Sequence, residues 1–343
     1  MSPRLKTISR SVLSILFAGV FLYLAFRNVR LGDLWNSLRE VHYGWIVLFV
    51  IVSLLSHIVR AVRWKIFLNP LKADTSYRNL FSAVMIGYMV NNILPRVGEL
   101  VRPYVIGKLE GISKSSALGT VVVERIIDTG SFFFILCAVL SLAPGSLSHF
   151  SQDAAALRPL FLAGSAVSVI AMFWLFLKSE SLFRFVRWFK PLVPHRFADK
   201  ADHVIDAFLT GFRVSRAREH FAMIAILSIV IWGLYALGLY VAFFAYDSLA
   251  ARGLGFDQAI ILLTVTSIAF VMPAPGAFGT YHSFLMLAMM KLYGVDSVTA
   301  LSYSVVTHEM GYLVVMTCGL YFFFKDHIRV KDLNAGTVQE SAS

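Results

Sequence analysis

Long apolar runs recur along the whole chain and are separated by shorter polar segments. The hydrocarbon core of a bilayer is about 30 Å thick, and a helix needs about 20 apolar residues to cross it. The runs are Ser11–Phe26, Trp45–Val59, Leu80–Leu94, Leu118–Ala143, Leu160–Leu177, Phe221–Tyr246, Ala259–Met272, Phe284–Leu292 and Ala300–Phe324. This pattern predicts an all-α, polytopic membrane helical bundle with about six full spans.

Two of these runs are too short to cross a bilayer and end in helix-breaking sequence. Leu80–Leu94 runs into the segment 91–99, which holds Pro95 and Gly98, and Ala259–Met272 runs into the proline- and glycine-rich segment 273–279. Backbone groups freed by a break at membrane depth must be buried in protein or line a cavity, because lipid offers them no hydrogen bonds. We therefore expect a re-entrant hairpin at each break.

The order of the runs is the same in the two halves of the chain. Residues 1–143 read as span, span, re-entrant pair and span, and residues 159–324 repeat that order. The first half makes an odd number of crossings, so the second half starts on the opposite side of the membrane. We expect two inverted repeats within a single integral membrane domain, 1–343, with the substrate near the midplane where the two breaks meet.

Composition and charge exclude a soluble protein and indicate an orientation. Hydrophobic residues make up 58% and charged residues 15%, whereas soluble domains are about half apolar and a quarter charged. The net charge of +11 does not indicate nucleic acid, because the basic residues gather in particular loops. Lys178–His220 carries nine of them and mixes them with aromatic residues. The positive-inside bias predicts a multi-pass protein of the cytoplasmic membrane with both termini cytoplasmic, and 178–220 as a cytoplasmic amphipathic segment.

Several charged residues fall inside the predicted membrane region, where charges are rare and mark function. They are Arg96, Glu99, Arg102, Glu124, Arg125, Asp128 and Glu309. Glu99 and Arg102 are three residues apart and can pair on one helical face. Two interpretations remain open. The charges form a structural salt-bridge network, or Arg96 and Arg102 bind a phosphate group while Glu99 and the group at 124–128 act as a switching network.

The remaining candidate residues lie near the breaks and at one helix end. Asn91 and Asn92 are expected either to bond the opened backbone or to line the substrate path. Arg60, Arg63 and Trp64 are expected to anchor a helix end at the membrane surface. The residues of the second break that shape the turn or lie beside it are Pro273, Pro275, Gly276, Gly279 and His282.

His308 and Glu309 form a candidate proton relay in the last span, and a satisfied core histidine is the alternative. We expect no metal site there, because no second ligand lies four residues further along that helix. We expect no cofactor, because the chain has no glycine-rich phosphate loop and no nucleophile elbow.

Four segments in order resemble a known family. They are Arg60–Trp64, Asn91–Tyr104, Thr120–Asp128 and Pro273–Thr280, and together they are similar to the lysylphosphatidylglycerol synthase transmembrane family of flippase-like integral membrane proteins. The resemblance implies a bacterial or archaeal cytoplasmic-membrane protein with a lipid flippase-type domain. In two-part relatives this domain moves an aminoacylated phospholipid made by an attached cytosolic synthase domain.

This chain departs from the family pattern in two ways. About twenty residues follow Phe324, so we expect no lipid aminoacylation by the chain itself. The family often has Gly-Gly after the second break and then Glu or Arg, whereas this chain has Ala274-Pro275-Gly276 and Tyr281-His282. The substrate therefore need not be lysylphosphatidylglycerol.

These observations lead to one expected function and two alternatives. We expect the chain to translocate an anionic lipid, either a phospholipid or a polyprenyl-linked glycolipid, and to act as a transporter more than as an enzyme. The alternatives are an auxiliary subunit in envelope lipid or polysaccharide synthesis and an intramembrane lipid-modifying enzyme. The expected partners are membrane lipid and a separate synthase or glycosyltransferase. With no ATP-binding motif, movement is downhill or coupled to protons through Glu309, His308 or Asp128.

Overall fold

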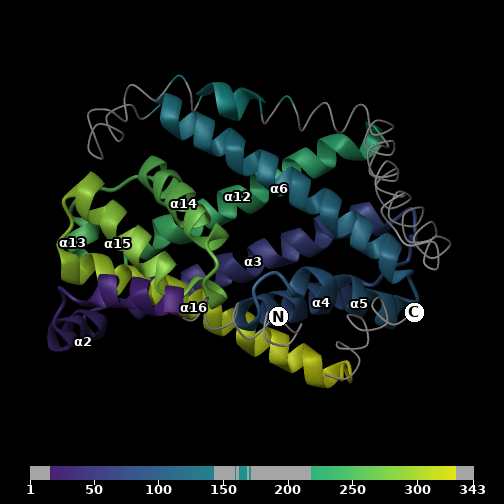
Figure 1. Ribbon diagram of the computed structural model, residues 1–343, viewed down its shortest axis with the longest axis horizontal. Coiled ribbons are helices and arrows are strands. Elements are labelled where there is room, and N and C mark those ends of the chain that lie inside the picture. The colour runs from purple at the N-terminus through teal and green to yellow at the C-terminus, as the bar shows by residue number, and fades with distance from the viewer. Residues whose placement is uncertain (1–15, 143–158, 160–161, 168–169, 171–217, 330–343) are drawn as a thin grey trace, which may run out of the picture.

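The computed structural model describes residues 16–142, 159, 162–167, 170 and 218–329 (Figure 1). Helices make up the ordered structure of these residues and no strand occurs among them, which confirms the all-α class. The predictions for 178–220 and for most of Leu160–Leu177 lie outside the described residues. The helices are Leu16–Phe26, α2 (Leu31–Arg39), α3 (Tyr43–Leu68), α4 (Tyr77–Ile93), α5 (Gly98–Glu110), α6 (Lys114–Leu142), α12 (Arg218–Phe243), α13 (Asp247–Ala250), α14 (Phe256–Val271), the short 3-10 turn η3 (Pro275–Ala277), α15 (Thr280–Tyr293) and α16 (Ser297–Lys325).

Three of the described helices, α3, α12 and α16, are long and apolar enough to cross a membrane. Helix α6 has 29 residues, as many as α16, but it carries three charged residues near its middle, at 124, 125 and 128. α3 and α12 pack against each other. The length and composition of these helices identify a membrane protein. The total of about six spans, and the side of the membrane on which each loop lies, stay predictions.

The two predicted breaks occur, and each separates a pair of short helices. α4 and α5 have 17 and 13 residues, and α14 and α15 have 16 and 14, so each is shorter than the 20 or so residues that span a bilayer. The second break turns at Gly276 and Gly279, whose φ angles of 54° and 76° are readily adopted by glycine. Whether these pairs are re-entrant in a membrane stays a prediction.

Small residues allow the helices around the first break to approach closely. A Cβ atom added at Gly98 would lie 1.9 Å from the carbonyl oxygen of Gly87, so α4 and α5 touch backbone to backbone. The two breaks also meet: a Cβ at Gly276 would lie 3.2 Å from the carbonyl oxygen of Asn92. The convergence of the breaks, which the sequence pattern predicted, is therefore present, although the inverted relation of the halves is not established by it.

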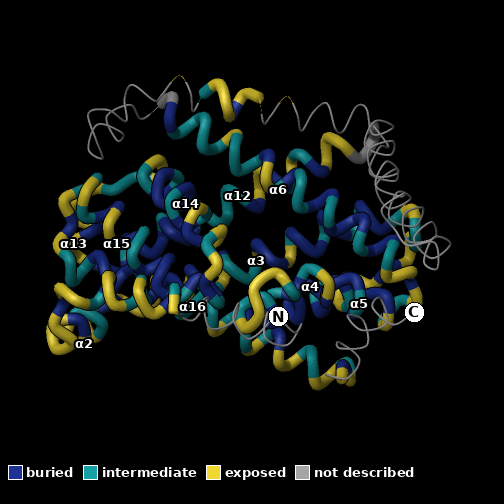
Figure 2. The backbone as a smooth tube through the Cα atoms, in the orientation of Figure 1, coloured by how far each residue is buried: buried dark blue, intermediate teal, exposed yellow. Residues whose placement is uncertain are grey.

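Burial is concentrated where the helices meet (Figure 2). One apolar cluster joins α12, α14, α15 and α16, and another joins α3, α4, α5 and α6. The outer faces of the long helices expose large apolar side chains, among them Val47, Ile229 and Phe324. An exposed apolar surface of this extent marks a contact with another protein or with a membrane. On helices long enough to cross a bilayer, we assign this contact to membrane lipid.

One carboxylate, Glu110, holds the start of α4 at the polar end of the α4–α5 pair. Its oxygens accept hydrogen bonds from Lys72 Nζ at 2.6 Å, from the backbone N–H of Ser76 at 3.0 Å and from Asn79 Nδ2 at 2.7 Å. Burial alone would raise its pKa, but these hydrogen bonds outweigh burial and lower the pKa below the ordinary value. The ionised form is therefore the one that stabilises the fold.

Replacing Glu110 with Gln should lower stability at neutral pH by about 1 kcal/mol, because hydrogen bonds to a charged group are lost. A group whose pKa is lowered by folding stabilises above its unfolded pKa and loses that contribution as the pH falls. The difference in Tm between wild type and E110Q, measured in detergent, should thus shrink on acidification. A difference that stays constant into the acid range would contradict this role.

Replacing Gly98 with Ala should destabilise the α4–α5 pair by about 1–3 kcal/mol, because the two backbones must move apart to admit a methyl group. Gly233→Ala is the matched control, since a Cβ there meets nothing within 4 Å and alanine favours helix. Thermal unfolding in detergent measures both. Equal Tm values for the two variants would show that the close approach is not required.

Candidate functional site

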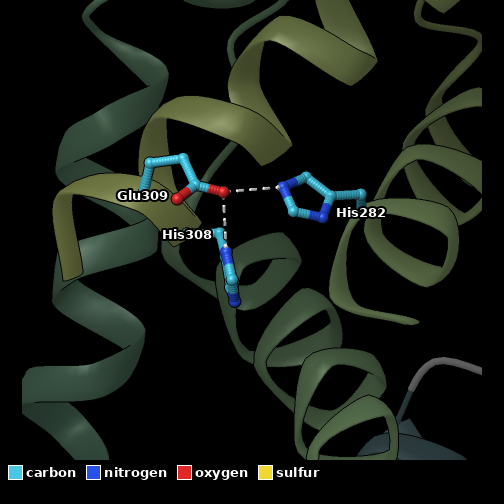
Figure 3. A group of neighbouring side chains, drawn as sticks. All are labelled: His282, His308 and Glu309. Carbon is cyan, nitrogen blue, oxygen red and sulfur yellow. Dashed lines mark hydrogen bonds and ion pairs between the residues drawn. The ribbon is translucent and has the colours of Figure 1, made fainter. Parts of the chain in front are cut away.

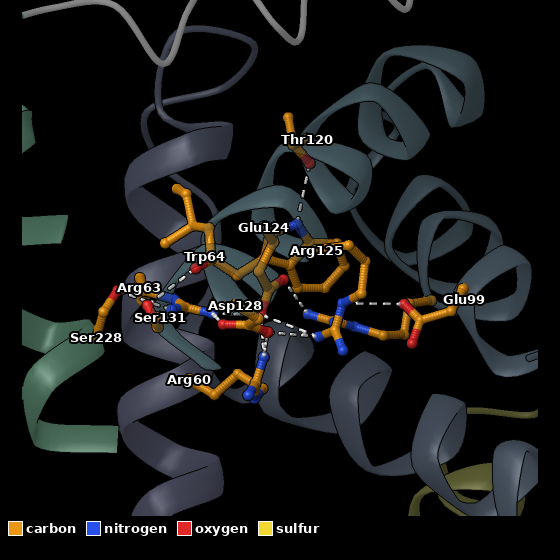
Figure 4. A network of polar contacts seen from close by, with 12 residues as sticks. Arg60, Arg63, Trp64, Glu99, Thr120, Glu124, Arg125, Asp128, Ser131 and Ser228 are labelled. Carbon is orange, nitrogen blue, oxygen red and sulfur yellow. Dashed lines mark hydrogen bonds and ion pairs between the residues drawn. The ribbon is translucent and has the colours of Figure 1, made fainter. Parts of the chain in front are cut away.

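Glu124 and Asp128 lie at the centre of a network of buried charges (Figure 4). They are one helical turn apart on α6 and face Arg60 and Arg63 of α3. Arg60 Nη1 contacts Glu124 Oε1 at 2.6 Å and Asp128 Oδ2 at 2.7 Å. Arg63 Nη2 contacts the same two carboxylates at 3.1 and 2.6 Å. Arg63 and Glu124 have no exposed side-chain surface, so the two helices are joined through ionic contacts in their interior.

Arg102 brings α5 into the same network. Its Nη2 donates to Glu124 Oε2 at 3.0 Å, and its guanidinium carbon lies 4.4 Å from the ring centroid of Trp64. The Trp64 ring is itself fixed, because Nε1 donates to Thr120 Oγ1 at 3.0 Å. A cation over a tryptophan face is attracted by the ring as well as by the carboxylate, so Arg102 is held from two directions.

Arg125 and Glu99 continue the network toward the first break. Arg125 Nη2 lies 3.2 Å from Asp128 Oδ2, and its Nε lies 3.5 Å from Glu99 Oε2. Asn91 Nδ2 donates to Glu99 Oε1 at 3.4 Å, while Asn91 Oδ1 accepts from the backbone N–H of Gly98 at 2.7 Å. Asn91 thus bonds the opened backbone, one of the two roles expected for it, and also reaches the charge network.

The network is not electrically balanced. Four arginines face three carboxylates, which leaves one formal positive charge in excess. Among the described contacts, Arg102 Nε and Nη1 and the Nε atoms of Arg60 and Arg63 are buried with no hydrogen-bond partner. Buried donors without partners are rare, and each calls for an explanation such as a ligand or water.

The positions of several predicted residues differ from expectation. The prediction that Arg60 and Arg63 anchor a helix end at the surface is wrong, because both are buried in the network. Arg102 pairs with Glu124 and not with Glu99, the partner that the spacing suggested, because Glu99 lies beside Arg125. Arg96 is exposed at the turn of the first break, with a φ of 69°, and it forms no ion pair with a described residue. The spacing of Arg60 and Arg63, which places both on one helical face like Glu124 and Asp128, is the signal in the sequence that indicates their pairing.

A second polar cluster, of His282, His308 and Glu309, lies beside the second break (Figure 3). Glu309 Oε1 is 3.4 Å from His282 Nε2 and 3.1 Å from His308 Nδ1. His308 Nε2 lies 2.8 Å from the carbonyl oxygen of Gly276, and the backbone N–H of Gly279 donates to His282 Nδ1 at 3.3 Å. Each histidine therefore bonds the backbone of the break with one nitrogen and faces Glu309 with the other. The sequence indicated the adjacent pair on α16 and placed His282 at the second break, and the structure brings His282 from α15 to that pair.

A family model described as the lysylphosphatidylglycerol synthase TM region matches the chain over residues 11–319. The chain belongs to this family. Both breaks, both polar clusters, α3 and α12 lie within the matched residues. Helix α16 begins within them and ends shortly after them, at Lys325.

Two of the similar proteins are named only as membrane proteins, and a third is named as a glycosyltransferase. A UPF0104 membrane protein of Methanothermobacter thermautotrophicus is 24% identical over 303 residues, which cover 84% of this chain and 87% of the relative. The UPF0104 membrane protein MJ1595 of Methanocaldococcus jannaschii is 30% identical over 136 residues, only 39% of this chain and 40% of that protein. The chain is also similar to the glycosyltransferase AglD of Haloferax volcanii, at 20% identity over 346 aligned residues that cover 93% of this chain and 54% of AglD. No solved structure matches the chain.

Replacing Glu124 with Gln should lower stability by about 3–5 kcal/mol, because arginines from two other helices then lie buried with one carboxylate fewer. Asp247→Asn is the control, since the pair that Asp247 forms with His42 is exposed and exposed pairs contribute about 1 kcal/mol or less. Thermal unfolding of both variants in detergent tests this. A Tm for E124Q as high as that of D247N would contradict a central role for Glu124.

Proposed function

We propose that this protein moves an anionic lipid between the leaflets of the cytoplasmic membrane. The observation that carries the proposal is the surplus positive charge of the buried network, together with the unpartnered guanidinium nitrogens of Arg102. A phosphate oxygen is an acceptor that these donors lack, and a phosphodiester supplies the single negative charge that balances the network. Guanidinium groups bind phosphate more strongly than neutral donors do.

The place of the network in the fold supports transport more than simple binding. It reaches the first break through Glu99 and Asn91, and that break lies against the second break at Gly276. Sites where two broken helices meet are typical of transporters built from inverted repeats. The multi-pass topology with both termini cytoplasmic, the re-entrant hairpins and the inverted repeat belong to this proposal.

Movement of the lipid requires the network to open, because Arg102 and Glu124 have no exposed side-chain surface. In our proposal the lipid phosphate replaces a carboxylate as the partner of Arg102 while Asp128 retains Arg60 and Arg63. The exchange keeps every arginine paired at each stage, and leaving one unpaired at this depth would cost several kcal/mol. Glu99, Glu124, Arg125 and Asp128 then act as the switching network.

A second candidate function comes from the similarity to AglD. Since a relative named as a glycosyltransferase matches 93% of this chain with only 54% of its own length, this chain would correspond to one part of such a protein. In that case it serves a separate glycosyltransferase, either as an auxiliary subunit or by moving a polyprenyl-linked glycolipid. A lipid-modifying activity of the chain itself is the third candidate.

The decisive experiment follows labelled lipids in liposomes containing the purified protein. Wild type should move an anionic phospholipid between leaflets faster than protein-free liposomes do, and faster than it moves a zwitterionic lipid. Arg102→Lys should slow this movement about tenfold, the equivalent of about 1.4 kcal/mol, because lysine keeps the charge but loses the planar donor set.

Arg252→Lys, in an exposed arginine that donates to the carbonyl oxygen of Tyr293, is the matched control and should behave as wild type. Both variants must show the Tm of wild type, which separates loss of function from loss of fold. Equal rates for wild type and R102K would refute the arginine mechanism. A lipid of changed mass in the extract would favour the enzyme instead.

A further inference from the structure

The cluster of His282, His308 and Glu309 has a hydrogen-bond pattern that one proton must complete. His308 Nε2 lies 2.8 Å from the carbonyl oxygen of Gly276, and a carbonyl oxygen only accepts, so Nε2 carries a hydrogen. His308 Nδ1 lies 3.1 Å from Glu309 Oε1, and a carboxylate oxygen also only accepts. A neutral histidine has one N–H, so a further proton must lie between Nδ1 and Oε1.

The other histidine does not supply that proton. His282 Nδ1 accepts the backbone N–H of Gly279 at 3.3 Å, so the hydrogen of a neutral His282 is on Nε2. That Nε2 lies 3.4 Å from Glu309 Oε1, so its hydrogen faces the carboxylate. Neutral His282 therefore needs no further proton, and the proton in question belongs to the pair of His308 and Glu309.

The same tautomers argue against a metal ion, although the three ligand atoms lie within 4.8 Å of one another. A metal needs a nitrogen lone pair, and His282 Nε2 carries a hydrogen. Only His308 Nδ1 and the Glu309 carboxylate remain as donors, fewer than the three or four protein ligands that zinc sites use. A proton fits this cluster better than a metal does.

The groups packed around the cluster are aromatic or hydroxylic. From α15, the Tyr281 ring lies 4.9 Å from the His308 ring between centroids, and the Tyr281 hydroxyl donates to Thr307 Oγ1 at 3.2 Å. Phe278 of the break and Tyr312 of α16 also contact the His308 ring, and Phe26 lies near His282. Among the described residues, the ion pairs of this cluster are confined to its own three members. Its net charge is therefore zero with the proton and −1 without it.

We propose that His308 and Glu309 bind one exchangeable proton between Nδ1 and Oε1, and that this proton is the coupling ion for the lipid movement proposed above, on which the second half of this inference rests. With the proton present, His308 holds the Gly276 carbonyl and fixes the second break. When the proton leaves, the Nδ1 lone pair faces a carboxylate oxygen, and the repulsion turns the ring away from Gly276. Release of the proton therefore loosens the break where it meets Asn92 of the first break.

Glu309 provides the way in and out for the proton. Its side chain is 31% exposed, whereas the rings of His282 and His308 are 2% and 4% exposed. A carboxylate at membrane depth that is partly uncovered must face a water-filled path, because facing lipid is too costly. In our proposal the proton reaches His308 through Glu309, the most exposed member of the cluster.

Nitrogen NMR of ¹⁵N-histidine-labelled protein in lipid nanodiscs, with the infrared band of protonated carboxyl groups, tests the proton site directly. Wild type should show either a His308 ring with both nitrogens protonated or a carboxylic acid band, and acidification should increase that signal. Glu309→Gln should abolish it, since the amide can donate an N–H to Nδ1 but holds no exchangeable proton there. His308→Gln should abolish it as well.

His42→Gln, in an exposed histidine paired with Asp247, is the control and should leave the signal unchanged. Two results would overturn the proton site. One is the absence of both signals throughout the pH range in which the protein stays folded. The other is stoichiometric binding of Zn²⁺ that shifts the resonances of both His282 and His308.

Labelled lipid in the same liposomes tests the coupling. If one proton moves with each lipid, a gradient of one pH unit at zero membrane potential should change the leaflet ratio of the lipid by about tenfold. H42Q should respond equally, and E309Q should not respond. If wild type moves no lipid while the proton signal is present, the proposed function fails and the proton site stands. If wild type moves lipid without any response to the gradient, the coupling is refuted and the proposed function stands.

Discussion

The contacts of a single buried carboxylate, Glu124, join α3 and α5 to α6. Its oxygens bind Arg60 and Arg63 of α3 and Arg102 of α5, so two other helices depend on one group of α6. None of these charges tolerates isolation in a low-dielectric interior, because the desolvation of an unpaired ion there costs several kcal/mol. The network reaches α4 through Asn91, which contacts Glu99 and the backbone N–H of Gly98 at the start of α5. These contacts set the position of the first break between α4 and α5.

From this carboxylate a chain of contacts leads across both breaks to the second polar cluster. Arg125 and Glu99 connect the network to Asn91, the neighbouring Asn92 lies against Gly276, and Gly276 binds His308. Each link is a backbone or charged contact with little freedom to adjust gradually. On the proposed function, a change of partner at one end shifts the break that the other end contacts, and this would couple the two sites.

Much of this arrangement could be predicted from the sequence, and the failures have a physical cause. The breaks were evident because proline and glycine interrupt apolar runs, and Glu124, Arg125 and Asp128 because charge is scarce in such runs. Arg60 and Arg63 were misplaced, since a basic pair near a helix end has the same pattern whether it contacts lipid headgroups or a partner helix. His282 joins His308 from 26 residues away, and a contact between two helices leaves no periodic signal along either one.

If the lipid site and the proton site act as proposed, the two clusters make the binding of a proton and of an anion favourable in the same state. The arginine network carries one surplus positive charge, and the histidine cluster carries one negative charge when its proton is absent. In that state the opposite charges compensate each other across the low-dielectric interior, where Coulomb interactions reach further than in water. Protonation of the His308–Glu309 pair removes the negative charge and leaves the surplus of the network uncompensated, which raises its affinity for a phosphodiester. Because such coupling is reciprocal, a bound lipid phosphate also favours the proton. On the proposed function, one proton and one singly charged lipid then move together without net charge, so the membrane potential does no work on the loaded protein.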